Sequence, residues 1–81
     1  MPNNERQKNI VGRRVAEARL LSKPPLTQDA LSGQLALAGI QLDRAAIAKI
    51  ERNHRCVLDY ELKALARVLN VQVDWLLGTQ E

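Results

Sequence analysis

The sequence predicts an all-α fold, a compact bundle of five short helices in one domain. Its apolar residues are almost all Leu, Ile, Val and Ala, with no Phe, one Tyr and one Trp. This composition favours helices packed through aliphatic stripes over a sheet sandwich. Cap residues divide the chain into short helical segments. With 81 residues the core is small, and a small core is often supplemented by self-association, so a homodimer is the default expectation.

The first two helices are expected on either side of a proline pair. The first begins near Asn9, and apolar residues at helical spacing mark its buried side: Val11, Val15 and Ala18. The segment 22–25 ends it, because a residue that precedes proline disfavours the helical conformation. Thr27 is a good N-cap for the second helix, which Gly39 ends. The buried stripe of that helix is Leu31, Leu35 and Ala38.

Three more helices follow, each with a recognisable cap. Asp43 starts the third, and Asn53 supplies the positive φ that ends it. Asp59 starts the fourth, which ends at Asn70 and whose buried stripe is Leu62, Leu65, Ala66 and Leu69. A last short helix over 73–77 is closed by Gly78. We therefore expect a flexible polar arm over 1–8, the folded domain over 9–78 and a tail over 79–81.

Positive charge is segregated along the chain, whose net charge is +3. The first helical region is basic, with Glu17 set against Arg6, Lys8, Arg13, Arg14, Arg19 and Lys23. A second basic segment carries Arg44, Lys49, Arg52 and Arg55, and the chain from Cys56 onward is net acidic. Such segregation indicates a polyanionic partner. A single cysteine and the lack of a long apolar run predict a cytoplasmic protein without a disulfide or a membrane span.

The third helix separates its cations from its aliphatic residues. At about 100° per residue, one side carries Arg44, Ala45, Ala48, Lys49 and Arg52. Ile47 and Ile50 lie on the other side and face the core. Small residues let a helix sit deep in a DNA major groove, about 12 Å wide, where Arg or Lys reaches guanine O6 and N7. Taken alone, the same pattern also describes an ordinary solvated helix face.

Neighbouring residues favour the DNA interpretation. Free N–H groups at the start of the second helix attract phosphate, and the Gln28 side chain can donate a further hydrogen bond. Arg55 comes just after the third helix, where a backbone phosphate lies within reach. Basic residues near the N-terminus add further backbone contacts: Arg6, Lys8 and Arg13.

His54 and Cys56 are better explained as ordinary residues than as a reactive pair. A zinc site needs three or four ligands, and the chain has one His and one Cys. A Cys–His pair at a helix end would also need a pocket and an oxyanion hole, which the sequence does not provide. The four glycines are dispersed and form no phosphate-binding loop. We therefore expect no enzyme, no metal and no cofactor.

Four segments in a fixed order carry a family resemblance. They are Thr27-Gln28-x-x-Leu31, Ile47-x-x-Ile50-Glu51, Leu65-Ala66-x-x-Leu69-Asn70-Val71 and Val73-Asp74-Trp75-Leu76-Leu77. Together they resemble the lambda-repressor-like (Cro/cI, XRE-type) helix-turn-helix family, over roughly residues 9–78. The resemblance implies a helix-turn-helix formed by the second and third helices and sequence-specific binding of double-stranded DNA. It also implies transcriptional repression of bacterial or prophage type, by a dimer on an inverted repeat.

The resemblance also assigns roles to individual residues. It places Arg44, Ala45 and Lys49 where the family reads bases, and Gln28 where the family binds a phosphate; the helical arithmetic adds Ala48 to the expected base-reading set. From their positions at the helix ends, Thr27, Arg52 and Arg55 are expected to bind phosphates as well. Arg19 and Glu51 match a buried ion pair that joins the first helix to the end of the third. The last helix is the expected dimer contact, through Trp75, Leu76 and Leu77.

Two departures from the family pattern are visible. The distance from Leu35 to Ile47 is longer than the usual spacing, so the second helix is longer or the turn is a true loop. Asn53-His54 stands where the family usually has Asn-Gly. A second hypothesis therefore remains: a protein-interaction module of the same fold, such as an antitoxin or a bridging factor. The short chain favours it somewhat, because many repressors of this family carry a separate dimerisation or effector domain.

Overall fold

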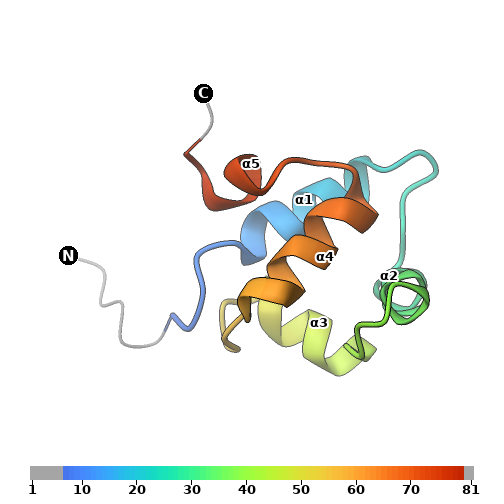
Figure 1. The fold of residues 1–81 in the computed structure, drawn as a ribbon, viewed down its shortest axis with the longest axis horizontal. Coiled ribbons are helices and arrows are strands. Elements are labelled where there is room, and N and C mark those ends of the chain that lie inside the picture. Colours follow the sequence, from blue (N-terminus) through green and yellow to red (C-terminus); the bar gives the residue numbers. More distant parts are fainter. Residues whose placement is uncertain (1–6, 80–81) are drawn as a thin grey trace.

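The structure, a computed structural model, describes residues 7–79 and contains five helices and no strand in that range (Figure 1). In chain order the helices are α1 (Gly12–Leu21), α2 (Gln28–Leu37), α3 (Arg44–Glu51), α4 (Asp59–Leu69) and α5 (Val73–Leu77). The expected all-α fold is confirmed. Residues 1–6 of the expected arm and 80–81 of the expected tail lie outside the described residues. None of the described helices has the length and apolar character needed to cross a membrane.

One aliphatic core joins all five helices. Helix α1 packs against α3, α4 and α5, while α2 packs against α3 and α4. The buried hydrophobic residues are Val11, Val15, Ala18, Leu31, Leu35, Leu42, Ile47, Ile50, Ala64, Leu65, Ala66, Leu69 and Leu76. Two expected members differ: Leu62 is only half-buried, and Ala38 is exposed because α2 ends one residue before it.

The caps explain where most helices begin and end. The Thr27 hydroxyl accepts the N–H of Ala30 at 3.0 Å, and the Asp43 carboxylate accepts that of Ala46 at 2.8 Å, as predicted. Asn53 and Asn70 have φ values of 64° and 59°, the left-handed conformation expected of them.

Helix α4 is capped differently from the prediction. Leu58, not Asp59, is its N-cap, and Asp59 is its first helical residue. The Glu61 carboxylate accepts the Leu58 N–H at 3.0 Å, which satisfies a donor that the cap would otherwise leave free. Glu61, and not Asp59 as predicted, therefore supplies the side-chain hydrogen bond at the start of α4.

A true loop over residues 38–43 separates α2 from α3. The Ile40 N–H donates to the Leu35 carbonyl at 2.9 Å and closes α2, while Gly39 has a φ of 86° that favours glycine. Leu42, 2% exposed, inserts into the core just before α3 begins. The loop is therefore anchored by one buried side chain at its C-terminal end.

Helix α1 begins in direct contact with the C-terminal end of α3. Gly12 is buried, and a Cβ atom built on it would overlap the carbonyl of Ile50 and lie 3.1 Å from the side-chain nitrogen of Asn53. Only a residue without a Cβ permits this approach of the two backbones. Gly12 therefore fixes how closely α1 packs against α3.

Candidate nucleic-acid interface

Helix α3 divides into a buried and an exposed side. Ile47 and Ile50 are both fully buried, as predicted. The opposite side carries Arg44, Ala45, Lys49 and Arg52, all exposed, with Ala48 half-buried between them. The exposed side therefore offers cations separated by methyl-sized residues, a shape that fits against the edges of base pairs.

The start of α2 lies next to this side of α3. An open hollow of about 530 Å³ there is lined by Arg19, Thr27, Gln28, Asp29 and Arg44. The Arg44 guanidinium and the Asp29 carboxylate are 3.6 Å apart, and both side chains are about 70% exposed. An ion pair this exposed holds its partners only weakly. The hollow thus joins a helix N-terminus to a cation that is easily released to another anion.

A buried ion pair holds α1, α2 and α3 together behind that hollow. The Arg19 guanidinium donates to both Glu51 carboxylate oxygens, at 2.8 and 3.0 Å, and to the Leu26 carbonyl at 2.9 Å. The hydrogen bond to Glu51 raises the pKa of Arg19 above its ordinary value. The Gln28 amide donates to the same carboxylate at 3.0 Å, a contact that the sequence analysis missed. Because an amide has two N–H donors, this contact leaves Gln28 one donor for another partner.

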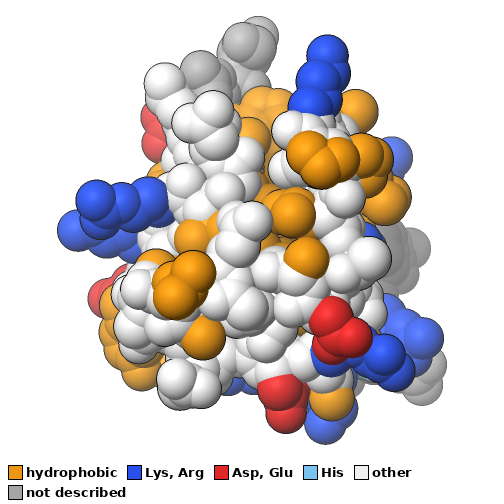
Figure 2. Space-filling model, turned by 90° about the vertical axis from the view of Figure 1, so that its right-hand side faces the viewer, with side chains coloured by type: hydrophobic (Ala, Val, Ile, Leu, Met, Phe, Trp, Pro, Cys, Tyr) orange, Lys and Arg blue, Asp and Glu red, His pale blue; other side chains and the backbone are white. Residues whose placement is uncertain are grey.

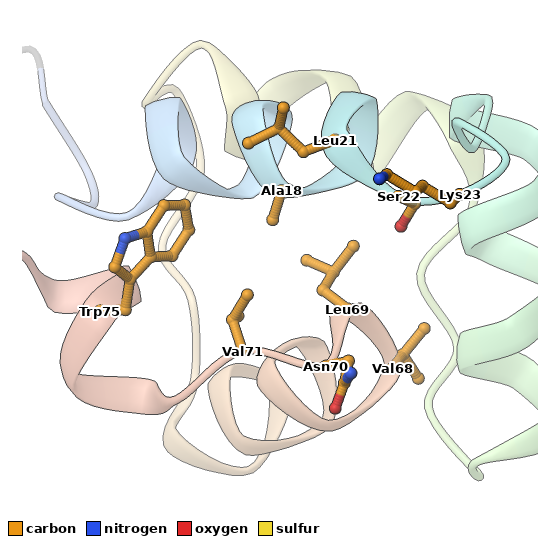
Figure 3. A pocket seen from close by; sticks show the side chains of 9 residues that line it. All are labelled: Ala18, Leu21, Ser22, Lys23, Val68, Leu69, Asn70, Val71 and Trp75. Carbon is orange, nitrogen blue, oxygen red and sulfur yellow. The ribbon is translucent and has the colours of Figure 1, made fainter.

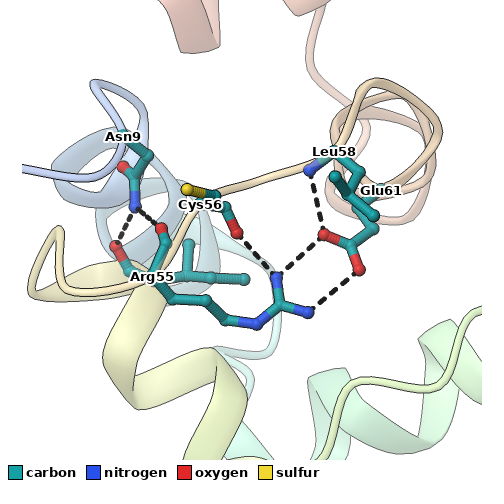
Figure 4. A network of polar contacts seen from close by, with 6 residues as sticks. Asn9, Arg55, Cys56, Leu58 and Glu61 are labelled. Atoms are coloured by element: carbon teal, nitrogen blue, oxygen red, sulfur yellow. Dashed lines mark hydrogen bonds and ion pairs between the residues drawn. The ribbon is translucent and has the colours of Figure 1, made fainter.

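Arg55 takes part in an ion pair that the sequence did not reveal. Its guanidinium donates to both Glu61 oxygens, at 2.8 and 3.1 Å, and to the Cys56 carbonyl at 2.8 Å (Figure 4). Arg55 therefore joins the end of α3 to the start of α4, and because its side chain is still 31% exposed, the phosphate contact expected of it stays a prediction. A Glu at the third position of a helix is the signal that could have revealed this pair.

We expect this pair to make the stability of the protein depend on pH. The hydrogen bonds from Arg55, and the Leu58 N–H to a lesser degree, lower the pKa of Glu61 below its ordinary 4.5 despite burial. A lowered folded-state pKa stabilises the fold at pH values above 4.5, and this stabilisation is lost as the pH falls through the folded-state pKa. Glu61→Gln should therefore cost about 1.5–3 kcal/mol at neutral pH and progressively less in acid.

The measurement is chemical unfolding of both proteins at several pH values. Glu17→Gln, on the exposed side of α1, removes the same charge without removing a buried pair and should show no such convergence. A constant difference between the wild type and Glu61→Gln from neutral pH to below 4.5 would contradict the role given to Arg55.

The three residues of α5 that were expected to form a dimer contact differ from one another in exposure and in their neighbours. Trp75 lines a hollow of about 500 Å³ between the C-terminal ends of α1 and α4 and helix α5 (Figure 3). The Arg14 guanidinium carbon lies over the Trp75 ring, 4.9 Å from the ring centroid. The same guanidinium donates to the backbone carbonyl of Trp75 at 3.1 Å. Leu77 is half-buried. Leu76 is fully buried in its own chain and has no surface to offer a partner.

The surface beyond these residues is mixed. On the face seen in Figure 2, hydrophobic side chains form several small clusters, and Lys and Arg side chains project at the edges. Among residues 7–79, no three His, Cys, Asp or Glu side chains lie close enough to hold a metal ion.

A comparison with protein-family models agrees with this geometry. The model of a family described as Helix-turn-helix matches residues 26–76, which contain α2, the loop, α3, α4 and most of α5. No curated protein and no solved structure gives a match. The matched segment covers more than half of the chain. It includes both parts of the candidate interface, the start of α2 and the exposed side of α3. The chain therefore belongs to the lambda-repressor-like, XRE-type helix-turn-helix family of DNA-binding regulatory domains.

Proposed function

We propose that this protein is a transcriptional regulator that binds double-stranded DNA sequence-specifically, with α3 in the major groove. The proposed role is that of a repressor of bacterial or prophage type. The division of α3 into a buried and an exposed side carries the proposal: Ile47 and Ile50 fix the helix to the core, so the opposite side is free to meet base edges. Arg44, Ala45, Ala48 and Lys49 are the proposed base-reading set.

The start of α2 and the end of α3 are proposed to bind the DNA phosphates on the two sides of the major groove. Thr27 and Gln28 begin α2, where backbone N–H groups and the helix dipole attract an anion. Glu51 holds the Gln28 side chain by one hydrogen bond, so its second N–H is proposed to meet a phosphate. Arg52 follows α3 and is exposed, so it is proposed to bind a phosphate beyond the end of that helix.

The proposed assembly is a homodimer on an inverted repeat, acting in the cytoplasm. Trp75 and Leu77 are retained as dimer contacts because each is partly exposed and Trp75 borders the hollow beside α5. The inverted repeat follows from two-fold symmetry, since each protomer would present one α3 to one half-site.

Selection from a random duplex pool at near-physiological salt, followed by sequencing, tests this function. Enrichment of an inverted repeat, with half-sites about one helical turn apart, would support a dimeric regulator. Binding that merely fades with salt, without enrichment, would contradict sequence-specific recognition and direct attention to a protein partner.

Lys49→Ala should weaken binding to the enriched duplex by about 1–3 kcal/mol and relax the preference at one base pair. Removal of a groove-facing cation loses both its base contact and its charge. Lys63→Ala removes the same charge from the exposed surface of α4 and is the matched control. Binding curves for both variants and repeated selection with Lys49→Ala provide the measurement. Equal behaviour of the two variants would show that α3 does not read the bases.

A further inference from the structure

An asparagine side chain ahead of α1 is hydrogen-bonded across the fold to the end of α3. The Asn9 amide nitrogen donates to the Ile50 carbonyl at 3.1 Å. It also donates to the Arg55 carbonyl at 2.7 Å (Figure 4). The side-chain oxygen of Asn9 accepts the backbone N–H groups of Val11 and Gly12, at 3.0 and 2.8 Å, at the start of α1. One side chain therefore satisfies backbone groups at the beginning of α1, in the last turn of α3 and just after α3.

Asn53 completes this arrangement from the other side. Its amide nitrogen donates to the backbone carbonyl of Asn9 at 3.0 Å and to its side-chain oxygen at 2.9 Å. Its own carbonyl accepts the N–H of Lys8 at 2.8 Å. We call Asn9 and Asn53 the asparagine latch. The residues before α1 are thus bound to the residue that terminates the groove-facing helix.

Next to the latch, the backbone of one more basic residue is hydrogen-bonded to the end of α3. Lys8 is exposed, and its backbone lies against Asn53, directly after Arg52. The carbonyl end of a helix favours positive charge, and the exposed side of α3 already carries Lys49 and Arg52. The backbone of Lys8 is thus held beside this end of α3, although Lys8 comes more than forty positions earlier in the chain.

We propose that the asparagine latch is a positioning device for DNA binding, which holds Lys8 where it contacts a backbone phosphate beyond the C-terminal end of α3. This inference rests on the proposed function and deepens it. Lys8 touches the DNA, whereas Asn9 and Asn53 are positioning residues that act through it. Because a tethered backbone loses less conformational entropy on binding, Lys8 beside the latch contributes more to affinity than it would on an untethered segment.

The test is a double-mutant cycle on the salt dependence of binding. Lys8→Gln removes the charge, and Asn9→Ser removes the donors to α3 while it keeps a short acceptor for the start of α1. Affinities for a labelled mixed-sequence duplex and for the enriched duplex are measured at several salt concentrations, at a temperature where circular dichroism shows every variant folded. Loss of one phosphate contact should lower the slope of log K against log salt by about 0.9.

We expect Lys8→Gln to weaken binding several-fold in the wild type and to have almost no effect in Asn9→Ser. Asn53→Gly keeps the positive φ but removes the latch side chain, and should behave like Asn9→Ser. Asn70→Gly is its matched control, because Asn70 has a similar φ and an exposed side chain at the end of α4; its binding should equal that of the wild type.

The outcomes separate the latch from the proposed function. Undiminished salt slopes in Asn9→Ser and Asn53→Gly, with a full Lys8→Gln effect in each, would make the latch purely structural and overturn the inference. A wild-type protein that binds neither duplex would overturn the proposed function, and this inference with it.

Discussion

Arg19→Met is expected to destabilise the protein by about 3–5 kcal/mol, because it leaves a buried carboxylate without its charged partner. The side chains of Arg19 and Glu51 are only 13% and 9% exposed. After the substitution, the Gln28 amide would be the one remaining side chain among those described that donates to that carboxylate. A loss of this size is a large part of the stability of a small domain, so much of the variant should be unfolded at physiological temperature.

Urea unfolding monitored by circular dichroism measures this loss, and the double variant Arg19→Met/Glu51→Met shows its origin. Replacement of both partners by apolar residues removes the uncompensated charge, so the double variant should be more stable than Arg19→Met alone. Arg44→Met breaks an exposed ion pair and should change the stability by at most about 0.5 kcal/mol. Additive losses in the double variant would show that the charge is not the cause.

Gly12→Ala is expected to cost about 2–3 kcal/mol, since the added methyl group meets backbone and not a movable side chain. The new Cβ would overlap the Ile50 carbonyl and lie 3.0 Å from its carbon, so α1 must move away from α3. Alanine is otherwise the better helix former, which makes a large loss at this position diagnostic of a steric cause.

Gly33→Ala provides the matched control for that substitution. Gly33 lies within α2, is exposed, and a Cβ built on it would meet no atom within 4 Å. The same chemical change should therefore stabilise the protein by about 0.5–1 kcal/mol. Thermal unfolding of the two variants should shift in opposite directions. A stabilised Gly12→Ala variant would mean that α1 and α3 are not in the close contact described.

Local patterns in the sequence predicted the ends of the helices well. Thr27 and Asp43 act as N-caps, and Asn53 and Asn70 have positive φ, because each depends on a few adjacent residues. The two sides of α3 followed from helical periodicity alone. The exposed Ala38 was misjudged because the apolar stripe continued past the point where the loop begins.

Contacts between distant residues were not predictable in the same way. Asn9 reaches carbonyls 41 and 46 residues away, and no local pattern encodes such a partner. Arg19 was paired with Glu51 through the family resemblance, whereas the part played by Gln28 depends on where α2 starts in space. One signal was available for Gly12: it lies seven residues before Arg19, on the same face of α1, and both meet the end of α3.

In α3, different residues contact the core and the proposed DNA surface, and this separation affects which substitutions the domain can accept. Its core contacts come from Ile47 and Ile50, whereas the proposed base-reading side chains of Arg44, Ala45 and Lys49 are exposed. Substitutions at exposed positions usually alter stability little, and the ion pair between Arg44 and Asp29 is itself exposed and weak. We therefore expect that randomising these three positions would change the proposed target preference and leave the folded scaffold intact.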